Sequence, residues 1–469
     1  MSAPATTEKK YLKWYQKLAY GSGDLASNCS YGLVSSFVLL YLTGTLGLDS
    51  AIIGSLMLAS KVLDGISDVI FGTLIDRTHS KLGKARPWML FGQVGVSLCL
   101  FLLFAIPAGS TTMQYIYFFI VYTALNAVFY TANGIAYSSL VALITKNNNE
   151  RVQLGSFRFM FAVVTNIFMG FAVTGMVEKF GSGAAGWRTT ALIFAIVGLV
   201  VNTISCLAVK ELPEEEPNDK APEAGTHTKA APEEKHGFAE TAKILIHNKY
   251  YLTILAIYIV YYIMSNLTTG AGVFCATYYW GDGSLLGQFS MMKMFPVIIA
   301  LAVAPVLIKK TGSMQKVNFW GYAISSVLGI PMIYFAMQKN LSMFLLFMFI
   351  KGIFAGTLSG SLNALIAEAS GYTTRTTGIH MDGMMYSCSS LGVKVGGGIG
   401  TAAVGWLLKL GGFVGTATVQ SESAIRMIFN LYITFPFVIG IIITVLLAFL
   451  DVEKANKKWD AEHKKEAQA

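Results

Sequence analysis

Charged residues are scarce in this 469-residue chain: Asp, Glu, Lys and Arg together make up 13% of it, about half of the ~25% found in soluble domains. Hydrophobic residues make up 54%, and the mean hydropathy is +0.56. A water-soluble globular protein of this composition would expose more apolar surface than it could bury. Disorder of the bulk of the chain is excluded because disorder requires low hydrophobicity. The composition therefore indicates a protein with many membrane-spanning helices.

The motifs of soluble enzymes and metalloproteins are also missing. The five cysteines lie within or beside apolar segments and form no CxxC pair, so we interpret them as packing residues and expect neither a disulfide framework nor a zinc site. We find no clustered histidine ligands, no HExxH, no nucleophile elbow and no complete ATP-binding motif. Residues 1–17 are polar and contain lysines, so no cleavable signal is predicted. These absences argue against an enzyme, a cofactor-dependent protein and an ATP-driven pump.

Twelve apolar runs are long enough to span a bilayer, which takes about 20 residues each. Continuous apolar length, rather than a helical period, carries this prediction. The predicted spans are 20–45, 51–75, 87–107, 113–144, 156–179, 187–209, 249–280, 285–308, 317–337, 342–369, 379–409 and 425–450.

The segment between the sixth and seventh spans is polar. Residues 210–236 contain four prolines and a dense run of glutamates, so they cannot bury enough apolar area to order themselves. We therefore expect a cytoplasmic linker over 210–247. It would join an N-terminal six-helix bundle, 1–209, to a C-terminal six-helix bundle with a cytoplasmic tail, 248–469. Two six-helix halves are typical of transporters built from repeats.

Positive charge is concentrated in alternate loops. Lys and Arg cluster at the N-terminus, after spans two, four and eight, and in the C-terminal tail, whereas the loops between hold few. The positive-inside rule then places both termini and the linker in the cytoplasm, which requires an even number of spans. Because the basic residues sit between apolar runs, the net charge of +9 gives no reason to expect nucleic acid as a partner.

Span two holds the most informative residues. Lys61, Asp64 and Asp68 fall at i, i+3 and i+7, so they share one helical stripe. Facing lipid, the three charges would cost about 8–10 kcal/mol, since each costs roughly 2.5–3.5 kcal/mol at the bilayer centre. The helix must therefore line the protein interior, where two carboxylates one turn apart suit a small cation or a proton. The alternative is a structural ion-pair cluster between helices.

Polar side chains mark other spans as well. Asp24 and Asn28 lie one turn apart in span one, a polar stripe ends span four, and Arg158 opens span five. Such groups can hydrogen-bond a sugar, or they can hold helices together, and Arg158 can also reach toward the surface. Further charged residues inside the apolar runs of the second half are Lys293, Lys351 and Lys394.

Four stretches carry a resemblance to a known family. They are KVLDGISDVIFGTLIDRTHSKLGKARPWMLFG from span two onward, YGSGDLASN in span one, YTANGIAYSSLVALIT with the NER turn after span four, and MMYSCSSLGVKVGGGIG in span eleven. With them the chain resembles the glycoside–pentoside–hexuronide:cation symporters of the major facilitator superfamily, over its whole length and more specifically in its first half. The resemblance implies alternating access of two bundles around a central site.

The resemblance also implies roles for individual residues. Asp64 and Asp68 would bind the coupling cation, and Thr131 would complete that site. Positions associated with the sugar site or with coupling are matched by Asn28, Tyr130, Arg158 and Lys394.

The chain departs from the family pattern at four places. Melibiose-type carriers have aspartates where this chain has Asn28 and Gly134, which argues against melibiose as the substrate. Ser67 stands where sodium-using members often have asparagine, which leaves Na⁺ and H⁺ both open. The usual tyrosine–glycine–glutamate signature before span eleven is altered to GYTTRTTGIHMDG.

We therefore predict an all-α integral membrane protein with twelve transmembrane helices in two six-helix bundles of the major facilitator type. It would carry a glycoside or hexuronide together with H⁺ or Na⁺, with no other cofactor. The expected setting is a bacterial cytoplasmic membrane, with the lipid bilayer, a sugar and a monovalent cation as partners and a monomer as the working unit. An uncoupled sugar facilitator and a non-transporting sensor on the same scaffold are the alternatives.

The predicted sites can be stated residue by residue. In the candidate cavity, five cations (Lys61, Arg158, Lys293, Lys351, Lys394) stand against three anions (Asp24, Asp64, Asp68), which favours an anionic sugar. The predicted cation ligands are Asp64, Asp68, Thr131 and Ser67. The predicted substrate ligands are Asp24, Asn28, Tyr130, Asn133, Tyr137, Arg158 and Lys394.

Overall fold

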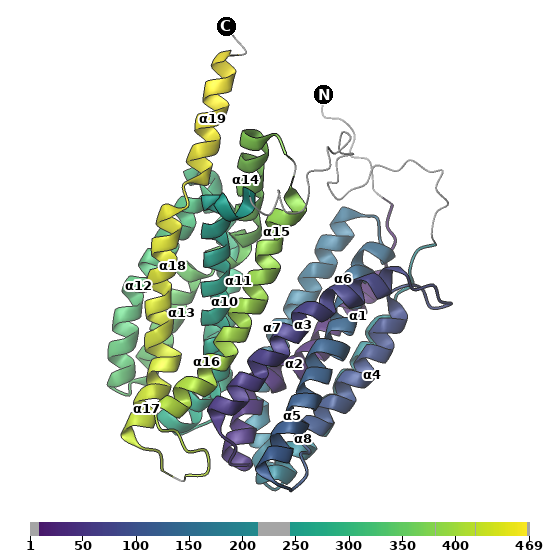
Figure 1. Ribbon diagram of the computed structural model, residues 1–469, viewed down its shortest axis with the longest axis vertical. Helices are drawn as coiled ribbons and strands as arrows, with labels where there is room; N and C mark the ends of the chain where they lie inside the picture. Colours follow the sequence, from purple (N-terminus) through teal and green to yellow (C-terminus); the bar gives the residue numbers. More distant parts are fainter. Residues whose placement is uncertain (1–8, 214–243, 380, 418, 467–469) are drawn as a thin grey trace. The chain divides into compact units, whose positions relative to one another are not determined.

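The computed structural model describes residues 9–213, 244–379, 381–417 and 419–466. In these ranges the regular structure is entirely helical, so the predicted all-α class is confirmed (Figure 1). The chain divides into two compact units, one of Met1–Leu48 with Ala59–Pro232 and the other of Asp49–Leu58 with Glu233–Ala469. Most of the predicted linker, 210–247, falls on residues 214–243, outside the described part.

The first unit packs α4 against α6 and α8, and α2 against α7 and α8. Its helices and π-helical turns (η) are α1 (Trp14–Gly21), α2 (Gly23–Leu40), η1 (Tyr41–Thr45), α3 (Ser50–Asp76), α4 (Arg86–Leu103), α5 (Thr111–Thr123), η2 (Ala124–Tyr130), α6 (Thr131–Ile144), α7 (Asn148–Lys179) and α8 (Gly183–Leu207).

The second unit packs α10 against α16 and α18, and α12 against α13 and α18. Its elements are α10 (Lys249–Phe274), η3 (Cys275–Trp280), α11 (Leu285–Thr311), α12 (Met314–Met337), α13 (Leu341–Ala355), α14 (Thr357–Thr377), α15 (Asp382–Leu391), η4 (Gly392–Gly396), α16 (Gly397–Leu410), α17 (Glu422–Phe429), η5 (Asn430–Thr434), α18 (Phe435–Phe449) and α19 (Val452–Glu466).

Eleven helical segments of the described chain are long and apolar enough to cross a membrane. The remaining predicted span is α3, which is 27 residues long but carries three charged residues in its middle. The start of α7 lies earlier than the predicted residue 156, because Asn147 caps the helix by accepting a hydrogen bond from the Glu150 N–H at 3.0 Å. The first turns of α7 are polar, so apolar length alone placed its start too late.

Glu150 also fastens the N-terminal segment to the first unit. Its carboxylate accepts hydrogen bonds from the backbone N–H groups of Tyr11 and Leu12, at 3.1 and 3.2 Å. It accepts a third from the Thr145 hydroxyl at 2.7 Å and forms an ion pair with Lys17 at 3.0 Å. Glu150, the glutamate of the NER turn, is 2% exposed, and these contacts fasten the N-terminal segment to the start of α7, so its role is structural.

The first part of α3, up to Leu58, groups with the second unit and the rest with the first. The Ser50 hydroxyl donates to the Gly405 carbonyl at 2.9 Å, and the Trp406 indole N–H donates to the Ser55 hydroxyl at 3.0 Å. A Cβ atom on Gly405 would lie 2.2 Å from the Ser50 carbonyl oxygen, so α16 can approach the start of α3 this closely only at a glycine.

An ion pair beside this crossing gives a pH prediction. Lys409 Nζ lies 2.7 Å from Asp49 Oδ2. Burial raises the pKa of Asp49, but hydrogen bonds from Lys409 and from the backbone N–H groups of Ala51 and Ile52 outweigh it, so the pKa lies below its ordinary value. A carboxyl with a lowered folded-state pKa stabilises the fold above its unfolded-state pKa. That stabilisation is lost as the pH falls through the folded-state pKa.

We therefore expect Asp49→Asn to lower the melting temperature at pH 7. This gap, the difference in melting temperature between variant and wild type, should close as the pH falls below about 4. Thermal unfolding of the two purified proteins between pH 3 and 8 measures this gap. Glu462→Gln, at an exposed position of α19, is the control and should show little gap at any pH. A gap for Asp49→Asn that stayed constant down to pH 3 would contradict the lowered pKa.

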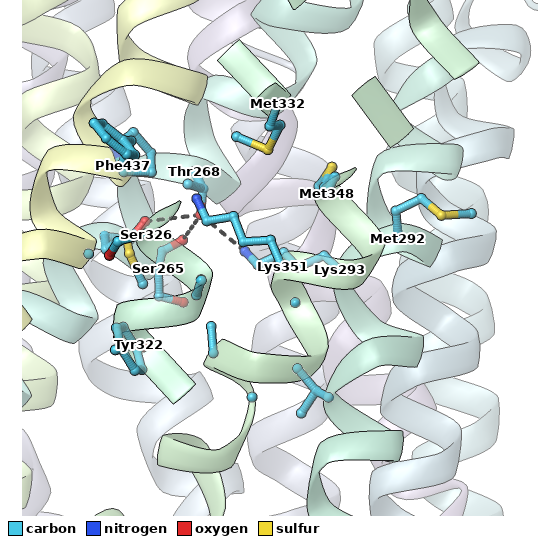
Figure 2. A pocket seen from close by; sticks show the side chains of 18 of the residues that line it. Ser265, Thr268, Met292, Lys293, Tyr322, Ser326, Met332, Met348, Lys351 and Phe437 are labelled. Atoms are coloured by element: carbon cyan, nitrogen blue, oxygen red, sulfur yellow. Dashed lines mark hydrogen bonds between the residues drawn. The ribbon is translucent and has the colours of Figure 1, made fainter. Parts of the chain in front are cut away.

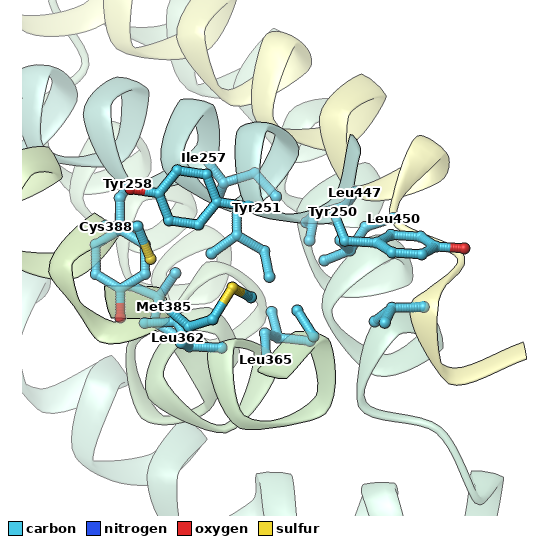
Figure 3. Packing of buried hydrophobic residues seen from close by; sticks show 14 of the residues in the cluster. Tyr250, Tyr251, Ile257, Tyr258, Leu362, Leu365, Met385, Cys388, Leu447 and Leu450 are labelled. Atoms are coloured by element: carbon cyan, nitrogen blue, oxygen red, sulfur yellow. The ribbon is translucent and has the colours of Figure 1, made fainter. Parts of the chain in front are cut away.

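A glycine stripe brings η4 and α16 against α10. Cβ atoms on Gly392, Gly396 and Gly400 would lie 2.3, 2.4 and 2.6 Å from atoms of α10, two of them backbone oxygens. The spacing of four residues places these glycines on one helical face, where the backbones meet directly. Figure 3 shows the apolar packing beside this contact, where Tyr258 of α10 lies near Cys388 of α15.

Neighbouring glycines allow a matched test of this contact. Gly396→Ala is expected to cost about 1–3 kcal/mol, because the Ile259 carbonyl oxygen, 2.4 Å from the new methyl group, belongs to a rigid helix. Gly397→Ala is the control, since its nearest neighbour is the Asn266 side-chain amide at 3.3 Å, which can shift. Thermal unfolding in detergent should show a drop of several degrees for Gly396→Ala alone. Equal melting temperatures would contradict the direct backbone contact.

Candidate functional site

Charged residues of α3 meet α6 inside the first unit. Lys61 Nζ lies 3.5 Å from Asp64 Oδ2, and the Thr131 hydroxyl lies 2.7 Å from Asp64 Oδ1. The side chains of Lys61 and Asp64 are 19% and 14% exposed, so the pair is mostly shielded from solvent. We call Lys61, Asp64 and Thr131 the cation cluster.

A π-helical turn positions Thr131. η2 ends at Tyr130, and the Thr131 hydroxyl lies 2.9 Å from the carbonyl oxygen of Asn126 as well as near Asp64. The hydroxyl has one proton, so it donates to only one of these oxygens at a time and keeps lone pairs for a cation. π-Helical turns often occur at functional sites. No sequence pattern considered above predicted this one.

The other two predicted cation ligands lie on the same helix. The Ser67 hydroxyl donates to the Asp64 carbonyl at 2.9 Å, which leaves its lone pairs available. Asp68 follows Asp64 by one turn and is half-buried. The structure therefore brings Lys61, Asp64 and Thr131 into contact and places Ser67 and Asp68 along the next turn of α3.

A second group of polar residues joins α2 to α7. Arg158 Nε lies 2.6 Å from Asp24 Oδ2, and the side chains of these residues are 25% and 17% exposed. The guanidinium carbon of Arg158 lies 4.2 Å from the ring centre of Tyr137, which is close enough for a cation–π interaction. We call Asp24, Arg158 and Tyr137 the arginine cluster. Arg158 therefore points into the first unit. The alternative that its side chain reaches toward the membrane surface is wrong.

Asn28 extends the arginine cluster along α2. Its amide nitrogen donates to the Asp24 carbonyl at 2.7 Å, and its amide oxygen accepts from Asn166 of α7 at 2.9 Å. Three residues further along α2, the Tyr31 ring stacks on Tyr130 with their centres 5.8 Å apart. Asn166 is not among the residues predicted from the sequence. A lone amide in an apolar span was the available signal, because such a group needs a polar partner in the membrane.

Two residues of the span-four stripe point into the bundle. Asn133 is 2% exposed and donates to Gln93 of α4 at 2.9 Å. The Tyr137 hydroxyl donates to the Tyr20 carbonyl at 2.8 Å, and the Tyr20 hydroxyl donates to the Tyr137 carbonyl. Asn133 therefore holds α6 against α4, whereas Tyr137 reaches the arginine cluster through its ring.

Lys394 lies in the second unit, within the π-helical turn η4. The roles of Lys293 and Lys351 were left open by the sequence, and both line one cavity of the second unit. Within the described residues, no three His, Cys, Asp or Glu side chains come together as a metal site would require. Asp64 Oδ1 and the Thr131 hydroxyl are oxygen atoms of the kind that hard cations bind.

Comparison with known proteins identifies the family. The chain matches the family model described as "MFS/sugar transport protein" over residues 19–454. It is 26% identical to the isoprimeverose transporter of Lactiplantibacillus pentosus, over 98% of this chain and 94% of that protein. It is 24% identical to the inner membrane symporter YicJ of Escherichia coli K12, over 92% of this chain and 90% of that protein.

The solved structures agree on the fold. A bacterial homologue of the human lysosomal transporter Spinster superposes with a TM-score of 0.70 at 13% identity, over 95% of this chain and 98% of that one. The predicted fold of a multi-span sugar transporter is thereby confirmed, and the chain belongs to the MFS/sugar transport family of the major facilitator superfamily.

Proposed function

We propose that this chain is a cation-coupled symporter that carries a glycoside or a hexuronide by alternating access. Relatives named as an isoprimeverose transporter, an inner membrane symporter and a glucuronide carrier homologue support a sugar and a coupling ion. The cation cluster carries the proposal, because it gives this chain a shielded carboxylate with an uncharged oxygen beside it.

Asp64 is the central cation ligand in this proposal. Its ion pair with Lys61 spans 3.5 Å, longer than the ~2.7–2.9 Å of a charge-assisted hydrogen bond, so a sodium ion bound at closer range can replace the ammonium group and a proton can neutralise the carboxylate. The Thr131 hydroxyl supplies a second oxygen, and Asp68 and Ser67 supply further oxygens from the next turn of α3. Binding of the cation thus releases Lys61 from Asp64.

The arginine cluster with Asn28 is the proposed sugar site. A guanidinium has five N–H donors, and a sugar hydroxyl pair matches its planar fork. The stacked rings of Tyr31 and Tyr130 supply an aromatic surface for the C–H face of the sugar. Lys394 stays a predicted substrate ligand, and only the family resemblance supports that prediction.

Coupling between the two sites follows from adjacent residues. Thr131 contacts Asp64, and Tyr130, directly before it, stacks on Tyr31 beside the arginine cluster. A shift of Thr131 toward a bound cation therefore moves Tyr130 as well. Linkage requires the effect to be reciprocal: if the cation raises sugar affinity, the sugar raises cation affinity by the same factor.

The driving force depends on the charge of the sugar. A neutral glycoside that moves with one cation gains about 2.3 kcal/mol per 100 mV, which gives roughly 40–50-fold accumulation. A hexuronide that moves with one cation transfers no net charge, so only the ion gradient drives it. Uptake of methyl glucuronide at a fixed ion gradient should then be insensitive to a potassium diffusion potential, whereas uptake of a neutral glycoside should rise with it.

The charge pattern supports a cytoplasmic-membrane protein with both termini and the 210–247 linker in the cytoplasm. In this arrangement residues 1–209 and 248–469 form the two six-helix bundles of a functional monomer.

Transport by purified protein in proteoliposomes tests the proposal. Neutral glycosides and glucuronides are supplied with an inward gradient of sodium, of protons, or of neither. A symporter should accumulate its sugar only with the correct cation gradient, and that cation should also increase the thermal stabilisation given by the sugar. Equilibration without accumulation would identify an uncoupled facilitator. Binding without counterflow would identify a sensor. Either result would contradict the proposal.

A further inference from the structure

A cavity of about 180 Å³ lies inside the second unit, bounded by α10, α11, α12, α13 and α18 (Figure 2). Lys293 of α11 and Lys351 of α13 both line it, whereas none of the described residues around it is Asp or Glu. Figure 2 shows the two lysine side chains extending toward a group of hydroxyl-bearing residues that includes Ser265, Thr268 and Ser326.

The surroundings of the lysines leave their charge unbalanced. Lys293 Nζ donates to the hydroxyls of Thr268 and Thr269 at 3.1 and 3.4 Å, and both of these partners are neutral. Within the described chain, neither Lys293 nor Lys351 forms an ion pair. Charges held at membrane depth require a counter-charge, a cavity or both. Here the cavity is present and the counter-charge is not supplied by the described chain.

A buried hydroxyl points to the same conclusion. The Ser326 Oγ atom is shielded from solvent and has no hydrogen-bond partner, although it belongs to a residue that lines the cavity. A buried polar atom without a partner is costly unless a bound group or water satisfies it. Two ammonium groups and an unpaired hydroxyl around one cavity form a donor set suited to the oxygen atoms of an anion.

We infer that this cavity binds a carboxylate or another oxyanion through Lys293 and Lys351, with Ser326 as an additional donor. The cavity has room for the anionic group and for part of an attached ring. Met292, Met348 and the other apolar residues of the wall suit the apolar part of a molecule that carries the anionic group. The carboxylate of a hexuronide is one source of the group, and this part rests on the proposed function; a free inorganic anion is the other.

A matched pair of sugars tests the site in the purified full-length protein. Methyl β-glucuronide and methyl β-glucoside differ only in a carboxylate in place of a hydroxymethyl group, and calorimetry gives the affinity of each. We expect the wild type to bind the glucuronide at least tenfold more tightly. Lys293→Met and Lys351→Met should each weaken glucuronide binding at least tenfold and change glucoside binding less than twofold.

Two further variants separate charge from general damage. Lys310→Met removes an exposed lysine from the same helix as Lys293 and should leave both affinities unchanged. Lys351→Arg keeps the positive charge and should retain a third or more of the glucuronide affinity. Retained glucoside binding shows that a methionine variant is folded. If a methionine variant does not fold, the arginine variant and the wild-type preference decide the matter.

The outcomes distinguish this inference from the proposed function. Equal binding of both sugars by the wild type, or equal weakening of both by the lysine variants, would overturn the anion site and leave sugar transport intact. If neither sugar binds, but inorganic phosphate raises the melting temperature of the wild type and not of the two methionine variants, the anion site stands with a free anion as its ligand. In that case the proposed sugar transport fails. Absence of binding by both sugars and by phosphate would overturn the anion site as well.

Discussion

Replacing Asp64 by asparagine is expected to reduce the sugar accumulation ratio from tens-fold to about one. Asparagine keeps the size of the side chain and an oxygen that accepts from the Thr131 hydroxyl, which lies 2.7 Å away in the wild type. It removes the negative charge that holds a sodium ion or proton. Uptake into proteoliposomes with an imposed cation gradient measures accumulation, and counterflow at equal cation concentrations measures exchange, which should persist.

The control for this experiment is a carboxylate outside the cation cluster. Glu178→Gln, at an exposed position near the end of α7, removes one negative charge from the same unit and should leave accumulation unchanged. If Asp64→Asn accumulates sugar as the wild type does, the proposed role of Asp64 is wrong. If neither protein accumulates sugar and both transport it at the same rate, the protein is an uncoupled facilitator and the proposed role is wrong as well.

A purely structural ion pair makes a different prediction. Removing the Asp64 carboxylate leaves the mostly shielded Lys61 without this ion-pair partner. A purely structural role of the pair therefore predicts a lower melting temperature for Asp64→Asn. The double variant Lys61→Met with Asp64→Asn removes both charges and should then restore stability and transport together. If the double variant is stable but still fails to accumulate sugar, Asp64 acts on the cation rather than on the fold.

Periodicity predicted the charged stripe of α3, because three charges on one face of an apolar helix have few stable arrangements. The same reasoning predicted a polar stripe at the end of span four. It did not show which residues of that stripe hold helices together and which belong to the candidate site. Asn133 pairs with Gln93 inside the bundle, whereas Tyr137 also reaches Arg158. A polar stripe that faces another helix and one that faces a cavity have the same spacing, so sequence alone does not distinguish them.

Other features of the site depend on tertiary packing. Thr131 entered the predicted site through the family resemblance, and its position depends on the π-helical turn η2 directly before it. A π-helical turn forms where a helix takes up one extra residue, and no particular residue pattern marks it. The cavity between Lys293 and Lys351 likewise joins α11 and α13, whose lysines lie far apart in the sequence.

Neutralising either partner of the Asp24–Arg158 ion pair is expected to abolish transport and to lower stability by about 3–5 kcal/mol, because each leaves a mostly buried charge uncompensated. The two atoms lie 2.6 Å apart, and both side chains are at most a quarter exposed. Asp24→Asn and Arg158→Met should both melt several degrees below wild type. Sugar binding and counterflow should fall below detection in each.

The double variant Asp24→Asn with Arg158→Met separates the fold from the sugar site. It removes both charges, so most of the lost stability should return, while sugar binding stays absent because the proposed hydrogen-bonding groups are gone. The exposed pair Lys458 and Glu462 on α19 is the control, since neutralising a solvent-exposed pair should change the melting temperature very little. Recovery of transport together with stability would mean that Asp24 and Arg158 hold α2 against α7 and do not contact the sugar. Recovery of stability alone, in a protein that still binds its cation, would place both residues at the sugar.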